Sequence, residues 1–92
     1  MARLDEGQIE ERLQGLEGWS RDGDAIAREL DRGDFMGSVE LVNQIAPVAE
    51  DMGHHPDLSI SWSTVTVTIT THSEGGLTEN DFELAGKIDA LA

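Results

Sequence analysis

The chain has 92 residues, enough for one domain with a modest core, and residues 1–92 are expected to form a single domain. Six basic residues against nineteen carboxylates give a formal charge of −13, which argues against direct nucleic-acid binding, since that needs a basic surface. There is no cysteine, so disulfide and thiolate chemistry are excluded. The acidic residues are dispersed, which predicts solubility in a salt-rich cytosol where screening relieves self-repulsion.

The beginning of the chain turns acidic at once, and no long apolar run follows. The sequence therefore predicts neither a secretory signal peptide nor a membrane-spanning segment. A soluble cytoplasmic protein is the expectation.

The first part of the chain predicts a helix followed by a β-hairpin. Asp5 can cap the helix, which is expected to end around residues 15–18. Two short strands, 19–21 and 25–30, then flank Asp22-Gly23, a dipeptide typical of tight hairpin turns.

A long helix is predicted next, capped by Asp34 and running to about Met52. Its apolar residues cover two neighbouring faces, more than one sheet would bury, so part of this surface is expected to pack against another subunit. Pro47 lies inside the helix. It removes one backbone hydrogen bond and clashes with the carbonyl of Asn43, which predicts a kink.

From Leu58 to His72 apolar residues alternate with polar ones, as in β-strands. The alternation changes parity at Ser63, which predicts a tight turn or bulge between two strands. On the second strand the threonines share the polar face with His72, which is therefore expected to project toward solvent or a ligand. Thr78, with Asp81 as its capping partner, begins the last helix.

The predicted element order is α-β-β-α-β-β-α. Two hairpins separated by a helix indicate an α+β fold, with a four-stranded antiparallel sheet and three helices on one face. The second hairpin could return His72 to the neighbourhood of His54.

All three histidines, His54, His55 and His72, lie in one short window. Histidine is the side chain whose ordinary pKa lies nearest neutrality, so their convergence predicts proton transfer or ligand binding. Adjacent imidazoles cannot point the same way on an extended backbone, and Pro56 keeps His55 extended, so the pair would serve two walls of a site. Glu50 is close enough upstream to hydrogen-bond an imidazole.

These residues also have structural explanations. A single histidine can be a solvated surface residue, Asp81 can be a helix cap alone, and Trp62 can belong to the core. A zinc site built from the histidines and a carboxylate would lack both cysteine and the usual histidine spacing, so no metal ligand is predicted.

One spaced pattern joins these positions: Glu50, three residues, His54-His55-Pro56, five residues, Trp62, nine residues, His72, eight residues, Asp81. This pattern resembles the signature of the pterin-4a-carbinolamine dehydratases. The resemblance extends over residues 4–91, and the α+β element order agrees with the fold of that family.

The resemblance implies a hydro-lyase that removes water from 4a-hydroxytetrahydropterin to give quinonoid dihydropterin, a step in tetrahydrobiopterin recycling. It implies acid/base catalysis by His54 and His72, with His55 binding or assisting, and leaves open which imidazole is acid and which is base. It implies no metal and no organic cofactor, because the pterin is the substrate. The residues implied for pterin binding are Glu50, Pro56, Trp62, Thr71 and Asp81.

Members of this family usually form homodimers or homotetramers, which agrees with the wide apolar surface of the long helix. The resemblance leaves other functions open: a role in molybdopterin metabolism, or a non-catalytic dimeric binding or assembly module. Ser61 and Ser63 stand where relatives often carry asparagine, so contacts to the pterin can differ in this chain.

Overall fold

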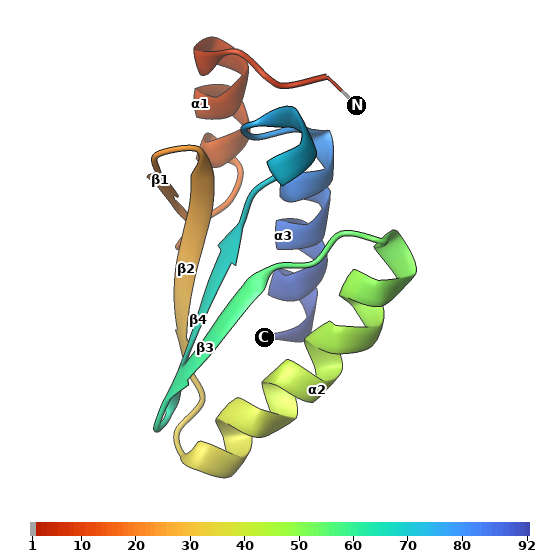
Figure 1. The fold of residues 1–92 in the computed structure, drawn as a ribbon. Helices are drawn as coiled ribbons and strands as arrows, with labels where there is room; N and C mark the ends of the chain where they lie inside the picture. Colours follow the sequence, from red (N-terminus) through yellow and green to blue (C-terminus); the bar gives the residue numbers. More distant parts are fainter. Residues whose placement is uncertain (1) are drawn as a thin grey trace.

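The computed structural model describes residues 2–92; Met1, the first residue of the predicted domain, lies outside the described residues. The elements follow the predicted order α-β-β-α-β-β-α (Figure 1). They are α1 (Glu6–Gln14), β1 (Ser20–Asp22), β2 (Ala25–Asp31), α2 (Phe35–Met52), β3 (Asp57–Ser61), β4 (Thr64–Ile69), the 3-10 turn η1 (His72–Glu74) and α3 (Glu79–Leu91).

The four strands form one antiparallel sheet in the order β1-β2-β4-β3, and the helices cover one of its faces (Figure 1), which confirms the predicted α+β architecture. Helix α2 packs on β4 and β3 and contacts α3 at its side. Strand β3 therefore lies at an outer edge of the sheet, beside the helix that leads into the paired histidines.

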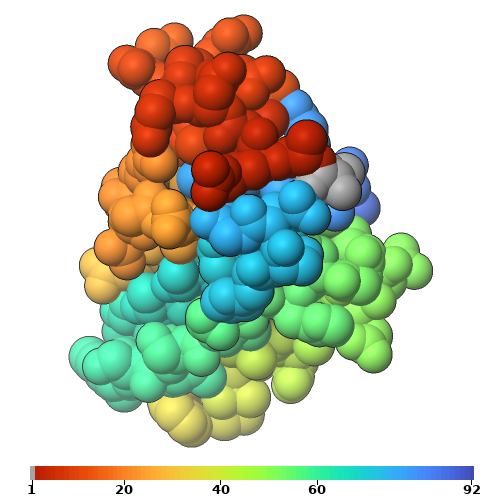
Figure 2. Space-filling view, turned by 45° about the horizontal axis from the view of Figure 1, so that its top comes forward, coloured from red at the N-terminus to blue at the C-terminus, as the bar shows by residue number. Residues whose placement is uncertain are grey.

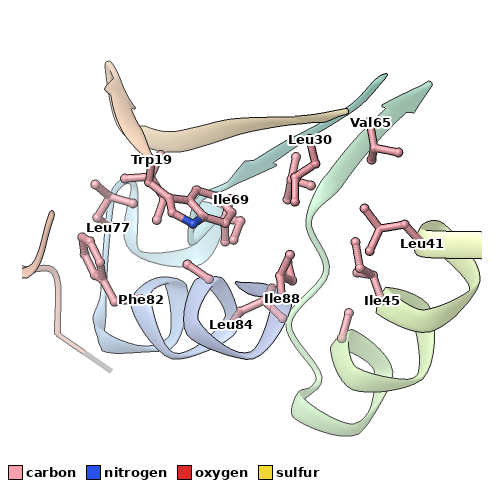
Figure 3. Packing of buried hydrophobic residues seen from close by; sticks show 14 of the residues in the cluster. Trp19, Leu30, Leu41, Ile45, Val65, Ile69, Leu77, Phe82, Leu84 and Ile88 are labelled. Atoms are coloured by element: carbon pink, nitrogen blue, oxygen red, sulfur yellow. The ribbon is translucent and has the colours of Figure 1, made fainter. Parts of the chain in front are cut away.

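The core lies between the sheet and the helices and is mainly aliphatic (Figure 3). Along β4, Val65, Val67 and Ile69 are fully buried while the threonines between them are half-buried, as the period-two pattern predicts. The other buried apolar residues are Ile9, Trp19, Ile26, Leu30, Leu41, Ile45, Ala49, Leu77, Phe82, Leu84, Ala85 and Ile88.

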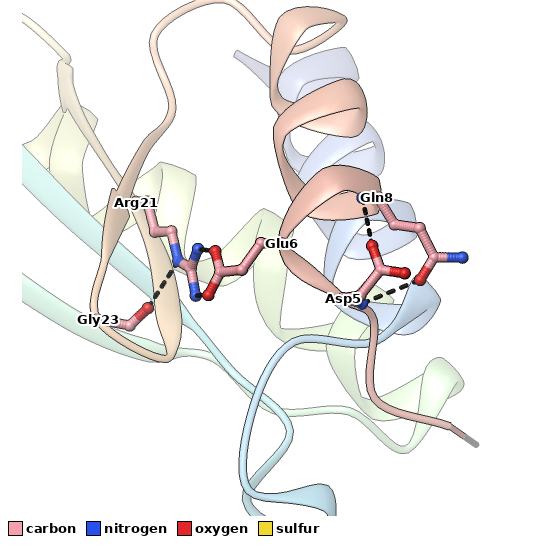
Figure 4. A network of polar contacts seen from close by, with 5 residues as sticks. All are labelled: Asp5, Glu6, Gln8, Arg21 and Gly23. Carbon is pink, nitrogen blue, oxygen red and sulfur yellow. Dashed lines mark hydrogen bonds and ion pairs between the residues drawn. The ribbon is translucent and has the colours of Figure 1, made fainter.

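Local capping sets where the first two helices begin. Asp5 Oδ1 accepts from the backbone N–H of Gln8 at 2.8 Å, and the Gln8 side chain accepts from the N–H of Asp5 at 2.9 Å (Figure 4). Asp34 caps α2 in the same way, through Gly37 N–H at 2.7 Å. Helix α2 is continuous across Pro47 and extends to Met52, as expected for its length.

The first hairpin differs from the prediction by one residue. Asp22 pairs with Ala25, so the turn is Gly23-Asp24 rather than Asp22-Gly23. Gly23 has a φ of 60°, and this left-handed value at the first turn position favours glycine. Arg21 donates to the Gly23 carbonyl at 2.9 Å and also pairs with Glu6 of α1 (Figure 4), so the hairpin is fastened to the first helix.

The second hairpin turns at Trp62-Ser63, in agreement with the parity change. Trp62 is not a core residue: it is 72% exposed and has a φ of 51°, a left-handed value that is rare for an aromatic residue. Two contacts hold the turn, since Ser38 Oγ donates to the Trp62 carbonyl at 2.9 Å and Arg32 N–H donates to the Ser63 carbonyl at 2.7 Å.

Strand β4 ends at Ile69, so the prediction that the strand runs to His72 is wrong. Thr71 forms an isolated bridge with Gly76, and the chain has to reverse between them. The reversal is η1 (His72–Glu74), and Gly75 follows it with a left-handed φ of 71°. His72 is therefore oriented by a tight turn instead of by strand alternation.

Candidate functional site

His54 is fixed by the end of α2. Gly53 adopts a left-handed conformation with φ 63°, and His54 N–H then donates to the Ala49 carbonyl at 3.1 Å. This ending turns the imidazole toward α3, where Nε2 lies 2.5 Å from Oδ1 of Asp81. The His54 side chain is 11% exposed and that of Asp81 is 0% exposed, so the contact is almost entirely removed from water.

Asp81 uses its second oxygen for a different purpose. Oδ2 accepts from the backbone N–H of Thr78 at 2.7 Å and from Thr71 Oγ1 at 2.8 Å, and the two threonine hydroxyls lie 2.9 Å apart. The helix-cap interpretation of Asp81 is thus confirmed, but the same carboxylate also holds an imidazole. A buried carboxylate with this many partners is satisfied and strongly positioned.

His55 pairs with the carboxylate predicted to reach a histidine. Its Nε2 lies 2.6 Å from Oε1 of Glu50, and both side chains are largely exposed. The two residues line an open hollow of about 440 Å³ together with Pro56, while α2 and β3 supply its apolar wall. That wall is formed by Ile45, Ala46, Pro47, Ala49 and Leu58.

His72 lies apart from the hollow that Glu50 and His55 line. It is exposed and lines a separate hollow of about 230 Å³ beside the β1–β2 turn, with Asp24 and Thr70 among its neighbours. The hollow at His55 does not include His72, and the hollow at His72 does not include His55. Only its neighbour Thr71 reaches the network around Asp81.

Trp62 lies at the opposite end of α2 from the paired histidines. Its carbonyl accepts from Ser38 in the first turn of α2, whereas His54 follows the last turn. The helix rises about 1.5 Å per residue, so Ser38 and His54 are separated by roughly 20 Å along its axis. The ribbon and the space-filling view agree, since the β3–β4 turn borders the start of α2 in both (Figures 1 and 2). Within one chain, Trp62 is not part of the hollow.

Ion pairs of α1 shift the pKa values of two of its side chains. A hydrogen bond and the positive charge of Arg21 lower the pKa of Glu6, and the Arg12 guanidinium, paired with Glu79, has a raised pKa. Both ion pairs attach α1 to its neighbours.

Within residues 2–92, no group of three or more histidine, cysteine, aspartate or glutamate side chains lies close enough to hold a metal ion. Over the same residues, no helix is both long and apolar enough to cross a membrane.

The geometry around His54 suits proton transfer. With Nε2 occupied by a carboxylate, Nδ1 is the ring nitrogen that can exchange a proton with a bound molecule. Sequence reasoning assigned the imidazole partner to Glu50 and did not predict the contact between Asp81 and His54. One signal for this contact was present in the sequence. Asp81 is the third residue of the last helix, and an acid there can cap the helix with one oxygen while the other oxygen is available to a second partner.

The fold and the site define a small α+β protein with two histidine–carboxylate pairs. The family model described as pterin 4 alpha carbinolamine dehydratase matches residues 2–91. The chain belongs to this family.

Individual relatives agree with this. A protein of Thermosynechococcus vestitus, provisionally named a pterin-4-alpha-carbinolamine dehydratase, is 48% identical over 98% of this chain and 95% of its own length. A Nocardia farcinica protein with the same provisional name is also 48% identical, over 97% of this chain and 94% of its own.

Solved structures are similar as well. The crystal structure of a transcriptional coactivator/pterin dehydratase from Brucella melitensis has a TM-score of 0.93 and 38% identity, covering 98% of both chains. A pterin dehydratase-like protein identified as a RuBisCO assembly factor in the alpha-carboxysome has a TM-score of 0.69 and 22% identity, covering 83% of this chain and 90% of that one. At this lower identity the likeness concerns the fold alone.

Proposed function

We propose that the protein is a hydro-lyase that removes water from 4a-hydroxytetrahydropterin to give quinonoid dihydropterin. The observation that carries the proposal is the contact between His54 and the buried Asp81, in a chain that belongs to the carbinolamine dehydratase family. A held imidazole with one free nitrogen is the group that such a proton-transfer reaction needs.

The reaction requires two proton movements. The 4a-hydroxyl leaves as water after it is protonated, and a proton is removed from a ring nitrogen to form the new double bond. His54 carries one of these protons. The second carrier is His55, at the hollow, or His72, which the family resemblance favours although it lies beside the β1–β2 turn. No metal or organic cofactor takes part in this scheme.

The hollow beside His55 supplies the binding surface. Its apolar wall suits one face of a flat bicyclic ring, and the Glu50 carboxylate can accept hydrogen bonds from ring N–H and amino groups. Because Glu50 already bonds His55, the same carboxylate would orient an imidazole and the substrate together.

The deciding experiment is the dehydration rate of chemically generated 4a-hydroxytetrahydropterin. The native chain is compared with His54→Ala, His55→Ala and His72→Ala, each shown to be folded by circular dichroism. The proposal expects a rate well above the uncatalysed one, a large loss for His54→Ala, and a pH profile that bends between about 5.5 and 8. Background rates from the native chain would overturn it.

The alternative is a non-catalytic binding or assembly module with the same fold, or a role in molybdopterin metabolism. The fold-level similarity to a RuBisCO assembly factor is the observation behind the first of these. A native chain that binds a pterin or a protein partner, does so equally well when His54 is replaced, and accelerates no dehydration would favour this alternative.

The proposal also includes assembly of the chain into a homodimer or homotetramer.

A further inference from the structure

Thr71 lies between two parts of the candidate site. Its side chain reaches Asp81, the carboxylate that holds His54, while its backbone leads directly into His72, the first residue of η1. Thr71 is 9% exposed. The family resemblance implies that it binds the pterin, but its hydroxyl already has two partners within the protein. A role inside the protein therefore fits this side chain better than a contact with the substrate.

The directions of the hydrogen bonds around Asp81 follow from the groups that donate them. The backbone N–H of Thr78 can only donate, and it meets Oδ2 at 2.7 Å. The Thr71 hydroxyl donates its single hydrogen to the same oxygen at 2.8 Å. The Thr78 hydroxyl lies 2.9 Å from that of Thr71 and must therefore be the donor of this pair. Both hydroxyl hydrogens consequently point along a chain that ends at the carboxylate.

This chain of hydrogen bonds determines which nitrogen of His54 carries a hydrogen. At neutral pH Asp81 is a carboxylate, which accepts at both oxygens and cannot donate. Its Oδ1 therefore accepts from Nε2 of His54, at 2.5 Å. A neutral imidazole in this position has its hydrogen on Nε2 and a bare Nδ1, so protons enter and leave at Nδ1.

The backbone of Thr71 holds the turn that carries His72. Its N–H donates to the Gly76 carbonyl at 3.2 Å, and its own carbonyl accepts from the N–H groups of Gly76 at 3.3 Å and Glu74 at 3.1 Å. These bonds involve no side-chain atom. A substitution that removes only the hydroxyl therefore leaves the turn in place and isolates the effect on Asp81.

We propose that Thr71 is a positioning residue, whose hydroxyl orients the Asp81 carboxylate and thereby keeps the hydrogen of neutral His54 on Nε2. Without this hydroxyl, Oδ2 retains one donor, and the carboxylate can turn about its Cβ–Cγ bond, a torsion with broad preferences. The imidazole then also adopts the tautomer with its hydrogen on Nδ1, which cannot accept a proton there. The catalytic consequence rests on the proposed function, whereas the tautomer does not.

The tautomer of His54 is measured by the 15N chemical shifts of its ring at alkaline pH, where imidazoles are neutral. His54→Ala identifies the signals. The native chain should carry the hydrogen on Nε2. Thr71→Val, which keeps the shape of threonine and removes the hydroxyl, should give a mixture of both tautomers, and Thr71→Ser should restore the native one. Identical shifts in the native chain and Thr71→Val would overturn the proposal.

Thr68→Val is the matched control. It is the same substitution on the same stretch of chain, but Thr68 belongs to the face of β4 opposite the core and is half-buried there. The shifts of His54 should stay native in this variant. A change as large as that in Thr71→Val would count against the proposal, because loss of any nearby threonine hydroxyl would then suffice.

Kinetics test the catalytic part of the proposal. The residues that line the hollow at His55 do not include Thr71, so Thr71→Val should leave KM nearly unchanged. Its kcat should fall about 10- to 100-fold, because the reacting imidazole is misplaced, and Thr71→Ser should recover most of it. A loss that appears in KM, or that serine does not recover, would show that Thr71 does not act by positioning.

The tautomer and the activity can fail separately. If the tautomer responds to Thr71→Val and Thr71→Ser as expected but the native chain accelerates no dehydration, the positioning role stands and only the proposed function fails. If Thr71→Val does not fold, the native chain still decides the question. Its Thr71 hydroxyl proton should exchange slowly with water, because it is buried and bonded to Asp81. Fast exchange of this proton, or a neutral His54 with its hydrogen on Nδ1, would overturn the proposal.

Discussion

Nε2 of His54 lies 2.5 Å from Oδ1 of Asp81, although 27 residues separate them in the chain. One carboxylate therefore joins the end of α2 to the start of α3. Because Oδ2 of Asp81 caps α3, the position of the imidazole depends on the first turn of that helix.

Asp81→Asn should impair both roles of the carboxylate. The amide keeps the shape but has a single acceptor oxygen, so if that oxygen caps α3, the amide can meet Nε2 of His54 only as a donor, which selects the opposite tautomer of the imidazole. We expect the dehydration rate to fall about 10²-fold or more, and the free energy of unfolding to fall by about 1–3 kcal/mol. Steady-state kinetics and urea unfolding measure the two effects.

Thr78→Val is the control for this substitution. It removes the hydroxyl that contacts Thr71 but keeps the N–H that bonds Asp81. Stability should fall by about 1 kcal/mol while the rate stays near native. A native rate for Asp81→Asn would show that the carboxylate does not position the imidazole for catalysis.

Glu50→Ala should affect function far more than stability. The contact with His55 is exposed, and pairs of this kind contribute about 0–1 kcal/mol. We expect the melting temperature to stay nearly unchanged while kcat/KM decreases, since the carboxylate both orients His55 and faces the hollow. Glu40→Ala, elsewhere on the exposed surface of α2, serves as the control. Equal kcat/KM values for the two variants would show that Glu50 does not contribute to the site.

The features that were predicted correctly are those determined by neighbouring residues. Asp5 and Asp34 cap helices through residues three positions away, and alternation along β4 shows which face is buried. The parity change located the turn at Trp62-Ser63 because a strand cannot change faces without one.

The errors arose where distant contacts decide the outcome. The alternation was extended through Thr71 to His72, but β4 ends at Ile69 and Thr71 forms an isolated bridge with Gly76. The contact between Asp81 and His54 depends on how α2 and α3 pack, which no local pattern encodes. Likewise, exposure of Trp62 follows from the geometry of its turn and not from its hydrophobicity.

Pro47→Ala should stabilise the protein. Proline inside a helix removes one hydrogen bond and crowds the preceding turn, at a cost that reaches about 3 kcal/mol. Pro47 is exposed, so alanine should fit without loss of packing and raise the free energy of unfolding by about 1–3 kcal/mol. Urea unfolding measures the change. A lower stability would mean that Pro47 itself stabilises the wall of the hollow.

The ion pair between Glu6 and Arg21 should make stability depend on pH. Its hydrogen bond and charge lower the pKa of Glu6 below the ordinary 4.5 in the folded state. The stabilisation is therefore complete above the ordinary value and is lost as the pH falls through the lowered one. Glu6→Gln should have a lower melting temperature than the native chain at pH 7, and the difference should disappear in acid. Glu10→Gln on the same helix should show little difference at either pH.

Salt should stabilise this acidic chain. A formal charge of −13 on 92 residues creates self-repulsion, which is screened over about 10 Å at 0.1 M ionic strength. The melting temperature is expected to rise from low to molar KCl. A melting temperature independent of KCl would contradict the expectation that the acidic composition suits a salt-rich cytosol.

The two oxygens of Asp81 have different partners, and this affects how enzymes can be told from scaffolds among relatives of this chain. A descendant that gave up the chemistry would still need an acid at this position, because the beginning of α3 requires it. An aspartate there is therefore uninformative about whether a homologue is an enzyme or a scaffold. Position 54 discriminates better, because ending α2 needs only its backbone N–H, whereas its imidazole serves the contact with Asp81 and the proposed proton transfer.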